Sequence, residues 1–536
     1  QKAPRDALLP ILEEDTEPVV LREVLRMLEH YPDLDLVAQI RDFASHDDAG
    51  VASLAIVWLK KVAGYKNTMD IHLDLMKSIR SEDSQERARA AKLAGKTAWV
   101  QATHDLPLMI DDPNLQVRMN AVEAMGQVGI PEYIDPLIVA LGRGDLSDRA
   151  LQALLRYGPA LVPEVESRIE TGKLNIATRI RLIGVIEGMA VGPALTLLMK
   201  CTDSQDLAIR NQAVLSMWRM GRDPMAPAPP ASWVKSYLIN DIALLNRYMQ
   251  LRVLLSGDTV RLRFFRDEIA ALQLQCETRA FRLFGLMHSR AAMHRAYLNY
   301  RSDTRRVRSN AIELLDQHIR DPELHEFVDV IERGLEGESE SLHARVLDDI
   351  DSKVAELLAD ETPWLSRCWA WVCVDTEVPK MDLEETDGVP HDPMDMVFML
   401  KSVPLFAGLS GEQLLPVADI VQRVTFERGD VVFEEGQPGL HVYLILEGEV
   451  EVISDGDRVA TLGTKECFGE MALLDQSKRS ASIRCLSDVV LLAISRDDFQ
   501  DLLDLHPALA KGVIRVLTQR LRGATDAIEQ ARQAAF

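Results

Sequence analysis

Hydrophobic positions in the first 360 residues recur with the spacing of amphipathic helices, and one pattern is repeated. The pattern is aliphatic-Arg-x-x-Ala-aliphatic-x-x-apolar, and one copy keeps only the arginine and the small residues. The full copies lie at 117–125, 209–217 and 307–315, and the partial copy lies at 86–94. Arg118 follows Arg87 by 31 positions, and Arg210 follows Arg118 by 92, close to three such periods. The period predicts a repeating helical unit over 1–360.

Glycines recur with nearly the same period, which predicts where the helices end. They are Gly64, Gly95, Gly126, Gly158 and Gly188. Glycine adopts the left-handed conformation that often follows a helix, so we expect each to mark a helix C-terminus. The segment 111–114, Asp-Asp-Pro-Asn, predicts a helix start with an aspartate as cap and the proline in the first turn.

The repeated unit resembles the HEAT repeat family, whose Asp-Pro…Val-Arg…Ala signature is matched at 112–125. The resemblance implies an α-solenoid in which each helix pair buries its apolar face against the next pair. It also implies a non-catalytic scaffold that presents a curved surface to a protein partner. The alternative is chance periodicity among the Ala- and Leu-rich helices of another bundle.

A break in composition follows the helical region. The segment 364–372 holds three of the seven tryptophans, and 375–394 is rich in acids and prolines, which is typical of a linker. We expect the tryptophans to lie on a last helix that packs against the end of the array; the alternative is an exposed docking patch. Cys368 and Cys373 have no histidine nearby, so no metal site is expected.

From Thr425 the pattern changes to short alternating runs separated by turn residues, which favours a β-barrel or jelly roll. The predicted strands are 431–433, 442–446, 450–453, 458–462, 482–484 and 489–494. Helices are expected at 398–421, 496–505 and 507–533. The fold class is therefore multidomain α + β, with an N-terminal α-solenoid and a C-terminal β jelly-roll barrel flanked by helices. The predicted domains are 1–360, the repeat array; 361–394, the terminal helix and acidic linker; and 395–536, the barrel.

Within the barrel, 468–481 combines groups suited to a nucleotide. Gly469 lets a ligand approach the backbone, and the Glu470 carboxylate can accept hydrogen bonds from sugar hydroxyls. Free amides of the turn that begins at Met471 can point at an anion. Arg479 offers a planar fork of donors for phosphate oxygens, and Ser480 adds a hydroxyl. No phosphate-binding GxxxxGK[ST] loop is present in the sequence.

This segment resembles the phosphate-binding cassette of cyclic nucleotide-binding domains, found in catabolite activator proteins, protein kinase A regulatory subunits and cyclic-nucleotide-gated channels. The resemblance covers roughly 400–530 and rests on Phe-Gly-Glu at 468–470 and Arg-Ser-Ala at 479–481. It implies that Glu470 binds the ribose 2′-hydroxyl and that Arg479 binds the cyclic phosphate. Gly469, Met471 and Ala472 would line the phosphate through backbone groups, and Ser480 would touch the phosphate or the base.

The base is contacted from the C-terminal helix in many relatives, where the candidates here are Thr525, Arg520 and Arg522. Ser480 favours cyclic AMP over cyclic GMP as the regulatory ligand, because the family tends to carry threonine there when the ligand is the guanine nucleotide. Lys478 departs from the usual small residue and adds positive potential. The alternative is a relic fold that binds nothing.

The formal net charge of −23 repels nucleic acid over most of the surface, so we expect no nucleic-acid partner. Six scattered cysteines are typical of reduced thiols in the cytoplasm. No apolar run reaches the ~18 residues of a membrane span. The chain begins at Gln1 rather than Met, so we expect a piece of a longer protein, and a location at the inner face of a membrane stays open.

These observations predict a cyclic-nucleotide sensor that uses no cofactor and regulates the helical scaffold or its partner. Two alternatives stay open, a scaffold whose barrel is a relic that binds nothing and the soluble regulatory region of a membrane nucleotide transporter. The order of domains also resembles the soluble C-terminal part of some bacterial nucleotide translocases, which would make the partner a membrane transporter domain. The third class is an enzyme, which we do not expect, since the sequence lacks HExxH, GxSxG, GxGxxG and kinase signatures.

Overall fold

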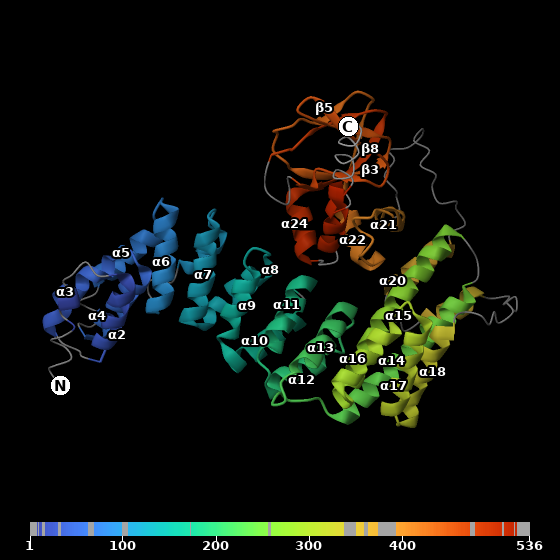
Figure 1. The fold of residues 1–536 in the computed structure, drawn as a ribbon, viewed down its shortest axis with the longest axis horizontal. Coiled ribbons are helices and arrows are strands. Elements are labelled where there is room, and N and C mark those ends of the chain that lie inside the picture. Colours follow the sequence, from blue (N-terminus) through green and yellow to red (C-terminus); the bar gives the residue numbers. More distant parts are fainter. Residues whose placement is uncertain are drawn as a thin grey trace, which may run out of the picture. The chain divides into compact units, whose positions relative to one another are not determined.

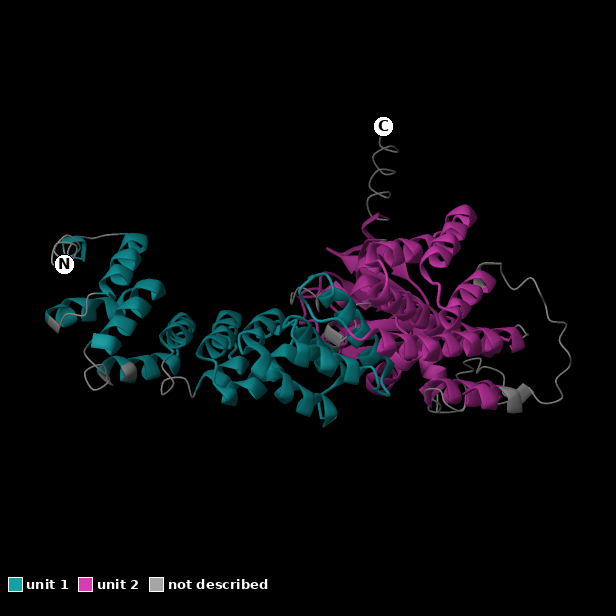
Figure 2. Cartoon of the chain, turned by 90° about the horizontal axis from the view of Figure 1, so that it is seen from below, with its two compact units in different colours: residues 1–228 teal, residues 229–536 magenta. Residues whose placement is uncertain are grey.

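The structure of the chain is a computed structural model, and it contains two compact units, Gln1–Ala228 and Pro229–Phe536 (Figure 2). Their boundary falls inside the predicted repeat array, so the units differ from the predicted domains, whose limits stay a prediction. The structure describes residues 8, 10–12, 17–30, 34–62, 69–98, 105–171, 173–255, 259–336, 350–358, 363–373, 393–471, 478–505, 509–518 and 520–522.

Unit 1 is helical throughout its described residues (Figure 1). Its α-helices are α2 (Pro18–Leu28), α3 (Val37–Asp42), α4 (Ala49–Val62), α5 (Met69–Ile79), α6 (Ser84–Thr97), α7 (Leu115–Val128), α8 (Ile134–Gly142), α9 (Ser147–Leu155), α10 (Val162–Glu170), α11 (Ile176–Glu187), α12 (Gly192–Cys201) and α13 (Leu207–Met220). Short 3-10 turns between them are η1 (Leu34–Leu36), η2 (Phe43–Ser45), η5 (Leu106–Asp111), η6 (Pro131–Tyr133) and η7 (Gly158–Leu161). Each helix packs on helices one or two places away along the chain, for example α6 on α7 and α7 on α9.

The repeated sequence pattern corresponds to one structural unit. Its four copies lie on α6, α7, α13 and, in unit 2, α17 (Arg305–His318), and every one of these helices has 14 residues. Each copy begins at the third residue of its helix. The predicted helical character of this region is confirmed, whereas its assignment to the HEAT family stays a prediction.

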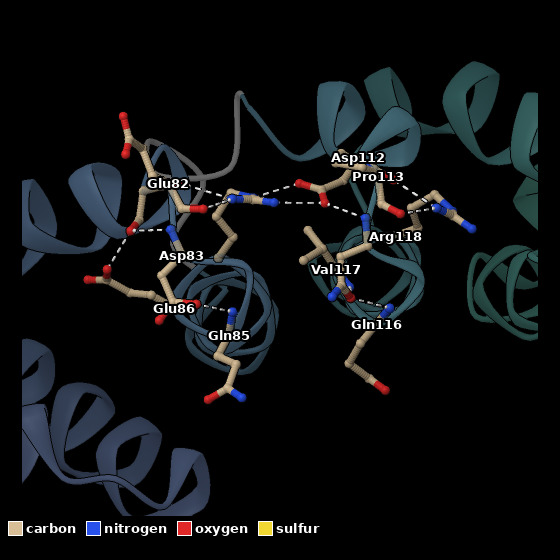
Figure 3. A network of polar contacts seen from close by, with 12 residues as sticks. Glu82, Asp83, Gln85, Glu86, Asp112, Pro113, Gln116, Val117 and Arg118 are labelled. Atoms are coloured by element: carbon tan, nitrogen blue, oxygen red, sulfur yellow. Dashed lines mark hydrogen bonds and ion pairs between the residues drawn. The ribbon is translucent and has the colours of Figure 1, made fainter.

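The arginine of the pattern clamps the loop that precedes its own helix. In three copies its Nη1 donates to the carbonyls six and five residues earlier, which closes the loop against the first turn. The bonds run from Arg87 to Ser81 and Glu82 (2.8 and 2.9 Å), from Arg118 to Asp112 and Pro113 (2.8 and 3.2 Å), and from Arg308 to Ser302 and Asp303 (3.2 and 3.3 Å). Figure 3 shows the Arg118 clamp. These carbonyls lie outside the helix, so the arginine supplies donors that the loop backbone lacks.

Two of these arginines also reach an acid in the next repeat. Arg87 binds Asp112 through Nε (2.7 Å) and Nη2 (3.0 Å), and Arg118 Nη2 lies 2.7 Å from an Asp145 carboxylate oxygen. The bond from Arg87 holds the pKa of the Asp112 carboxyl below its ordinary value. The predicted aspartate cap of the next helix is therefore wrong: Asn114 caps α7, and Pro113 precedes that cap, because the Asp112 carboxylate is held by Arg87.

Two of the periodic glycines have a different role from the predicted one. Gly95 and Gly126 lie inside α6 and α7 rather than at their ends. A Cβ at Gly95 would lie 2.6 Å from the Cα of Ala124, and one at Gly126 would lie 2.6 Å from the Cα of Ala153. They let neighbouring helices touch through their backbones. Gly188 is the C-cap residue of α11 and Gly158 follows α9 at φ +63°, as helix-end residues should, while Gly64 lies outside the described residues.

Unit 2 begins with a second set of helices. They are α14 (Ala231–Leu254), α15 (Val260–Met287), α16 (Arg290–Tyr300), α17, α18 (Pro322–Glu336), α19 (Ile350–Leu358) and α20 (Pro363–Cys373). The long helices α14 and α15 are joined by a buried ion pair, in which Arg279 binds Asp241 through Nη2 (2.5 Å) and Nε (2.8 Å). Both side chains are almost fully buried, so each charge is compensated by the other.

The tryptophan-rich segment forms α20, which packs on α15. Trp364 and Trp371 are buried, and the Trp369 ring lies 5.5 Å from the Phe265 ring of α15. The interpretation as a packed last helix is confirmed, and the exposed docking patch is wrong. Most of the predicted linker, 374–392, lies outside the described residues.

Two four-stranded antiparallel sheets follow, ordered β1-β8-β3-β6 and β2-β7-β4-β5. Figure 1 shows this region with β3, β5 and β8 labelled. The strands are β1 (Gln422–Phe426), β2 (Val431–Phe433), β3 (His441–Glu447), β4 (Val450–Ser454), β5 (Asp457–Leu462), β6 (Cys467–Phe468), β7 (Ser482–Cys485) and β8 (Val489–Ser495). Both sheets contribute to one apolar core, since Ile445 and Leu491 of the first pack with Val450 and Ile483 of the second. All six predicted strands are present; β1 and β6 were missed, because β1 is half exposed and β6 has only two residues.

The helices around the sheets are α21 (Pro393–Lys401) and α22 (Gly411–Ile420) before them, and α24 (Arg496–Leu505) after them. The single helix predicted over 398–421 is wrong, because the chain turns between α21 and α22 at 402–409, and Ser410 then starts α22 with a capping box. Residues 509–518 and 520–522 are helical and form the C-terminal helical segment. No helix within the described ranges has the length and hydrophobicity needed to cross a bilayer.

We expect Gly126→Ala to lower the free energy of unfolding by about 1–3 kcal/mol, because the new Cβ would overlap the backbone of Ala153. The matched control is Gly184→Ala inside α11, where nothing lies within 4 Å of the new Cβ. That change should raise the free energy of unfolding by about 0.5–1 kcal/mol, since alanine favours a helix over glycine. Urea unfolding followed by circular dichroism measures both; equal effects of the two variants would contradict the close helix contact.

Candidate ligand-binding site

The candidate site begins where β6 ends. β6 pairs with β3, with Phe468 opposite Tyr443, and the chain then turns at Gly469, whose φ is +84°. A Cβ at this position would lie 2.4 Å from Nη1 of Arg479 and 3.1 Å from the His441 carbonyl oxygen. Position 469 therefore requires glycine for two reasons: the backbone has a positive φ, and the Arg479 guanidinium lies where a Cβ would be.

Arg479 is held in this corner by backbone groups and aromatic rings. Its Nη1 donates to the Gly469 carbonyl (3.0 Å) and its Nη2 to the His441 carbonyl (2.7 Å), while its guanidinium carbon lies 4.0 Å from the centre of the Phe433 ring. Burial lowers the pKa of the Arg479 guanidinium below its ordinary value. An arginine keeps its charge at neutral pH even so, and a buried cation of fixed orientation suits an anionic ligand.

Glu470 is held from the C-terminal helical segment. The carboxylate is 1% exposed, and its Oε1 accepts a hydrogen bond of 2.5 Å from Nη1 of Arg520. Arg520 also donates to the carbonyl of Cys467 through Nη2. Burial raises the pKa of the nearby Cys467 thiol to about 12, so this thiol is protonated at neutral pH and is no nucleophile.

Each of the two charged residues retains one buried polar atom without a hydrogen-bond partner among the described residues. These atoms are Oε2 of Glu470 and Nε of Arg479. Buried polar atoms in folded proteins are mostly paired. The Nε atoms of Arg89 and Arg423 and Oε1 of Glu268 share this condition, so the two atoms point to a ligand only together with the Gly469 turn and the anchored Arg479 guanidinium. The site thus offers one carboxylate acceptor for a hydroxyl and one guanidinium donor for an anion.

The structure brings Gly469, Glu470 and Arg479 together, and the roles predicted for the site residues stay a prediction. Met471 is half exposed, and exposed Ser480 accepts a hydrogen bond of 3.4 Å from Ser454 through its carbonyl. Ala472 and Thr525 lie outside the described residues. Arg520, a candidate for the base, has Glu470 as its partner, and Arg522 is exposed.

Sequence reasoning missed three contributors to the site. One is His441, whose carbonyl accepts a hydrogen bond from Arg479. Phe433 and Tyr443 belong to the family resemblance but were given no role in binding, and both rings lie beside the guanidinium, where Tyr443 stacks on Phe468. Alternate residues of a strand face the barrel interior, so the positions of Phe433 and Tyr443 within their strands could have indicated that both rings point inward.

Comparison with known proteins identifies this part of the chain. Residues 423–506 match the family model described as the cyclic nucleotide-binding domain. The chain is 36% identical over 130 residues to the cyclic AMP receptor protein of Thermus thermophilus, which covers 23% of this chain and 60% of that protein. It is 35% identical over 106 residues to the cAMP-dependent protein kinase regulatory subunit of Emericella nidulans, and this alignment covers 19% of this chain and 26% of that protein.

The crystal structure of the Thermus thermophilus catabolite activator protein matches 24% of this chain and 63% of its own chain, with 34% identity and a TM-score of 0.23. The chain therefore spans less than two thirds of the length of each of these relatives. What it shares with them is the C-terminal domain, which is a cyclic nucleotide-binding domain of the family that includes catabolite activators and protein kinase A regulatory subunits.

We expect Arg520→Ala to lower the free energy of unfolding of the ligand-free protein by about 1–3 kcal/mol, because buried Glu470 loses its charged donor. Combined with Glu470→Gln, the same change should cost less, since a neutral amide needs no counter-charge. Chemical unfolding of the two single variants and the double variant measures the difference. Arg522→Ala is the control, an exposed arginine of the same segment with an expected effect within about 0.5 kcal/mol; strictly additive effects would contradict the pairing.

Proposed function

We propose that this chain is a cyclic-nucleotide sensor, in which binding at the C-terminal domain regulates the helical region or a protein that docks on it. The observation that carries the proposal is the pair of unpartnered buried atoms, Glu470 Oε2 and Arg479 Nε. A cyclic nucleotide presents a ribose hydroxyl, which can donate to the carboxylate, and a phosphate, which can accept from the guanidinium. One ligand would satisfy both atoms.

The proposed ligand is cyclic AMP. Two relatives are named for it, the cyclic AMP receptor protein and the cAMP-dependent kinase subunit. Ser480 supports the same choice, since it occupies the position where threonine would favour the guanine nucleotide. Cyclic GMP is the competing ligand, and it differs from cyclic AMP only in the base. Comparing the affinities of the chain for the two nucleotides therefore shows which one it prefers.

The regulatory event begins with the bond between Arg520 and Glu470. A ribose hydroxyl that binds Glu470 shares this carboxylate with Arg520. The contact between the C-terminal helical segment and the cassette therefore changes in strength when the ligand binds. A ligand can shift such an equilibrium only by the difference between its affinities for the two states, typically about 1–3 kcal/mol. We propose regulation by this change in contact, with no catalytic step.

Calorimetric titration of the full chain with cyclic AMP and cyclic GMP tests the proposal. We expect cyclic AMP to bind, and Arg479→Ala to weaken binding by about 10- to 100-fold, which matches the roughly 1.5–3 kcal/mol of a charged hydrogen bond. Arg484→Ala is the matched control, because Arg484 lies on β7, is half exposed and pairs with Glu451 at 3.5 Å.

The outcomes separate the proposal from its alternatives. Unchanged affinity in Arg484→Ala with a loss in Arg479→Ala supports the cassette as the site. No heat with either nucleotide would show a relic fold, and equal losses in both arginine variants would show that the phosphate is bound elsewhere.

A further inference from the structure

A buried carboxylate far from the cassette joins the helices of unit 2 to the cyclic nucleotide-binding domain. Glu268 of α15 is 2% exposed, and its Oε2 accepts hydrogen bonds from Nε1 of Trp364 (3.0 Å) and from the backbone N–H of Gly411 (2.9 Å). Its Oε1 lies 3.4 Å from Nζ of Lys401. One carboxylate thus binds α20, the first residue of α22 and the last residue of α21.

Trp364 and Glu268 approach Gly411 so closely that no side chain fits at this position. A Cβ at Gly411 would lie 2.3 Å from the Trp364 ring and 3.1 Å from Oε2 of Glu268, so only glycine allows the indole to touch the start of α22. The free N–H groups at a helix start carry partial positive charge, which suits the Glu268 carboxylate. A second contact set supports the joint, since Trp371 of α20 donates to Asp395 of α21 at 2.8 Å.

The same turn that follows α21 supports the segment that holds the nucleotide site. Lys401 donates through Nζ to the carbonyl of Leu409. Gly512 of the C-terminal helical segment approaches this turn so closely that a Cβ would lie 2.2 Å from the Leu405 carbonyl oxygen. Arg520, eight residues further along, binds Glu470 of the cassette.

A cavity of about 230 Å³ lies between parts of these elements. Its lining includes Leu405 from the turn, Cys467 from β6, and Val516 and Arg520 from the C-terminal helical segment. A displacement of Arg520 when ligand engages Glu470 can therefore change how the segment bears on the turn without opening the core.

We propose that Glu268 couples the nucleotide site to helices α15 and α20, because it fixes both ends of the turn on which the C-terminal helical segment rests. This inference rests on the proposed function, since it needs a ligand at Glu470 and Arg479. Glu268 is a positioning residue: it touches no ligand, and it carries a displacement of the turn into α15 and α20 through three short contacts. The helical region is then the part of unit 2 that responds to the nucleotide.

Hydrogen-exchange mass spectrometry of the full chain, with and without saturating cyclic AMP, tests the coupling. In the wild type we expect cyclic AMP to change the exchange of 363–373 and of the N-terminal half of α15. In Glu268→Gln we expect this change to fall at least fivefold, while calorimetric affinity for cyclic AMP stays within about threefold of the wild type, because Glu268 does not touch the ligand.

Glu277→Gln is the matched control. Glu277 lies on the same helix, is 4% exposed and accepts a hydrogen bond of 2.8 Å from Gln273, within the helices of unit 2. It should keep the wild-type exchange response, since its loss disturbs α15 without touching the joint. Should Glu268→Gln fail to fold, Trp364→Phe keeps an aromatic ring at this position but removes both the N–H donor to Glu268 and the indole edge beside Gly411, and it should reduce the response by about half.

The outcomes distinguish this inference from the proposed function. Binding of cyclic AMP to the wild type with no exchange change in α15 and α20 overturns the coupling alone. The coupling through Glu268 is also overturned when Glu268→Gln and Glu277→Gln respond alike. Absence of cyclic AMP and cyclic GMP binding to the wild type overturns the proposed function, and the coupling with it.

Discussion

Removing a charged group from water costs several kcal/mol unless donors or acceptors surround it, and the organisation of this chain depends on how that cost is offset. Where the chain supplies all partners, the charge fixes structure: Arg279 binds Asp241 through three N–H···O contacts. In the cassette the compensation is incomplete, since Glu470 and Arg479 each retain an unpartnered atom among the described residues. That difference separates a structural ion pair from a site that needs a ligand.

A second constraint is the closeness of backbones at joints between elements. Gly126 brings α7 against Ala153, Gly411 brings α22 against Trp364, and Gly512 brings the C-terminal helical segment against Leu405. In each case the missing side chain allows a polar or packing contact that no other residue would allow. These three glycines have no positive φ and are needed only for close contact. Gly469 differs, because it has both a close contact and a positive φ that turns the chain.

Local patterns in the sequence predicted what local physics decides. Alternation predicted six strands close to their observed bounds. The chemistry of segment 468–481 and its family resemblance predicted one site there, and in the structure Arg479 bonds the carbonyl of Gly469, next to Glu470. The sequence could not predict partners that lie far apart along the chain: Gly411 follows Glu268 by 143 positions, and Arg520 follows Glu470 by 50. Nor could it show that Asn114 caps α7, because that depends on Asp112 being held by the preceding helix.

The contrast between Glu470 and Glu268 indicates how a sensor can divide its tasks. Both carboxylates are almost fully buried, and each has one oxygen that accepts no hydrogen bond from the described residues. They differ in what surrounds them: Glu268 accepts two hydrogen bonds on its other oxygen and has the Lys401 ammonium 3.4 Å away, so groups from three elements contact it, whereas Glu470 is bonded by Arg520. A ligand changes the energy of a site most where atoms lack partners, and a joint transmits motion best where its contacts already hold. The Glu470 carboxylate, beside the cationic Arg479 in the cassette, therefore suits detection, and the Glu268 carboxylate, which contacts α20, α21 and α22 at once, suits transmission.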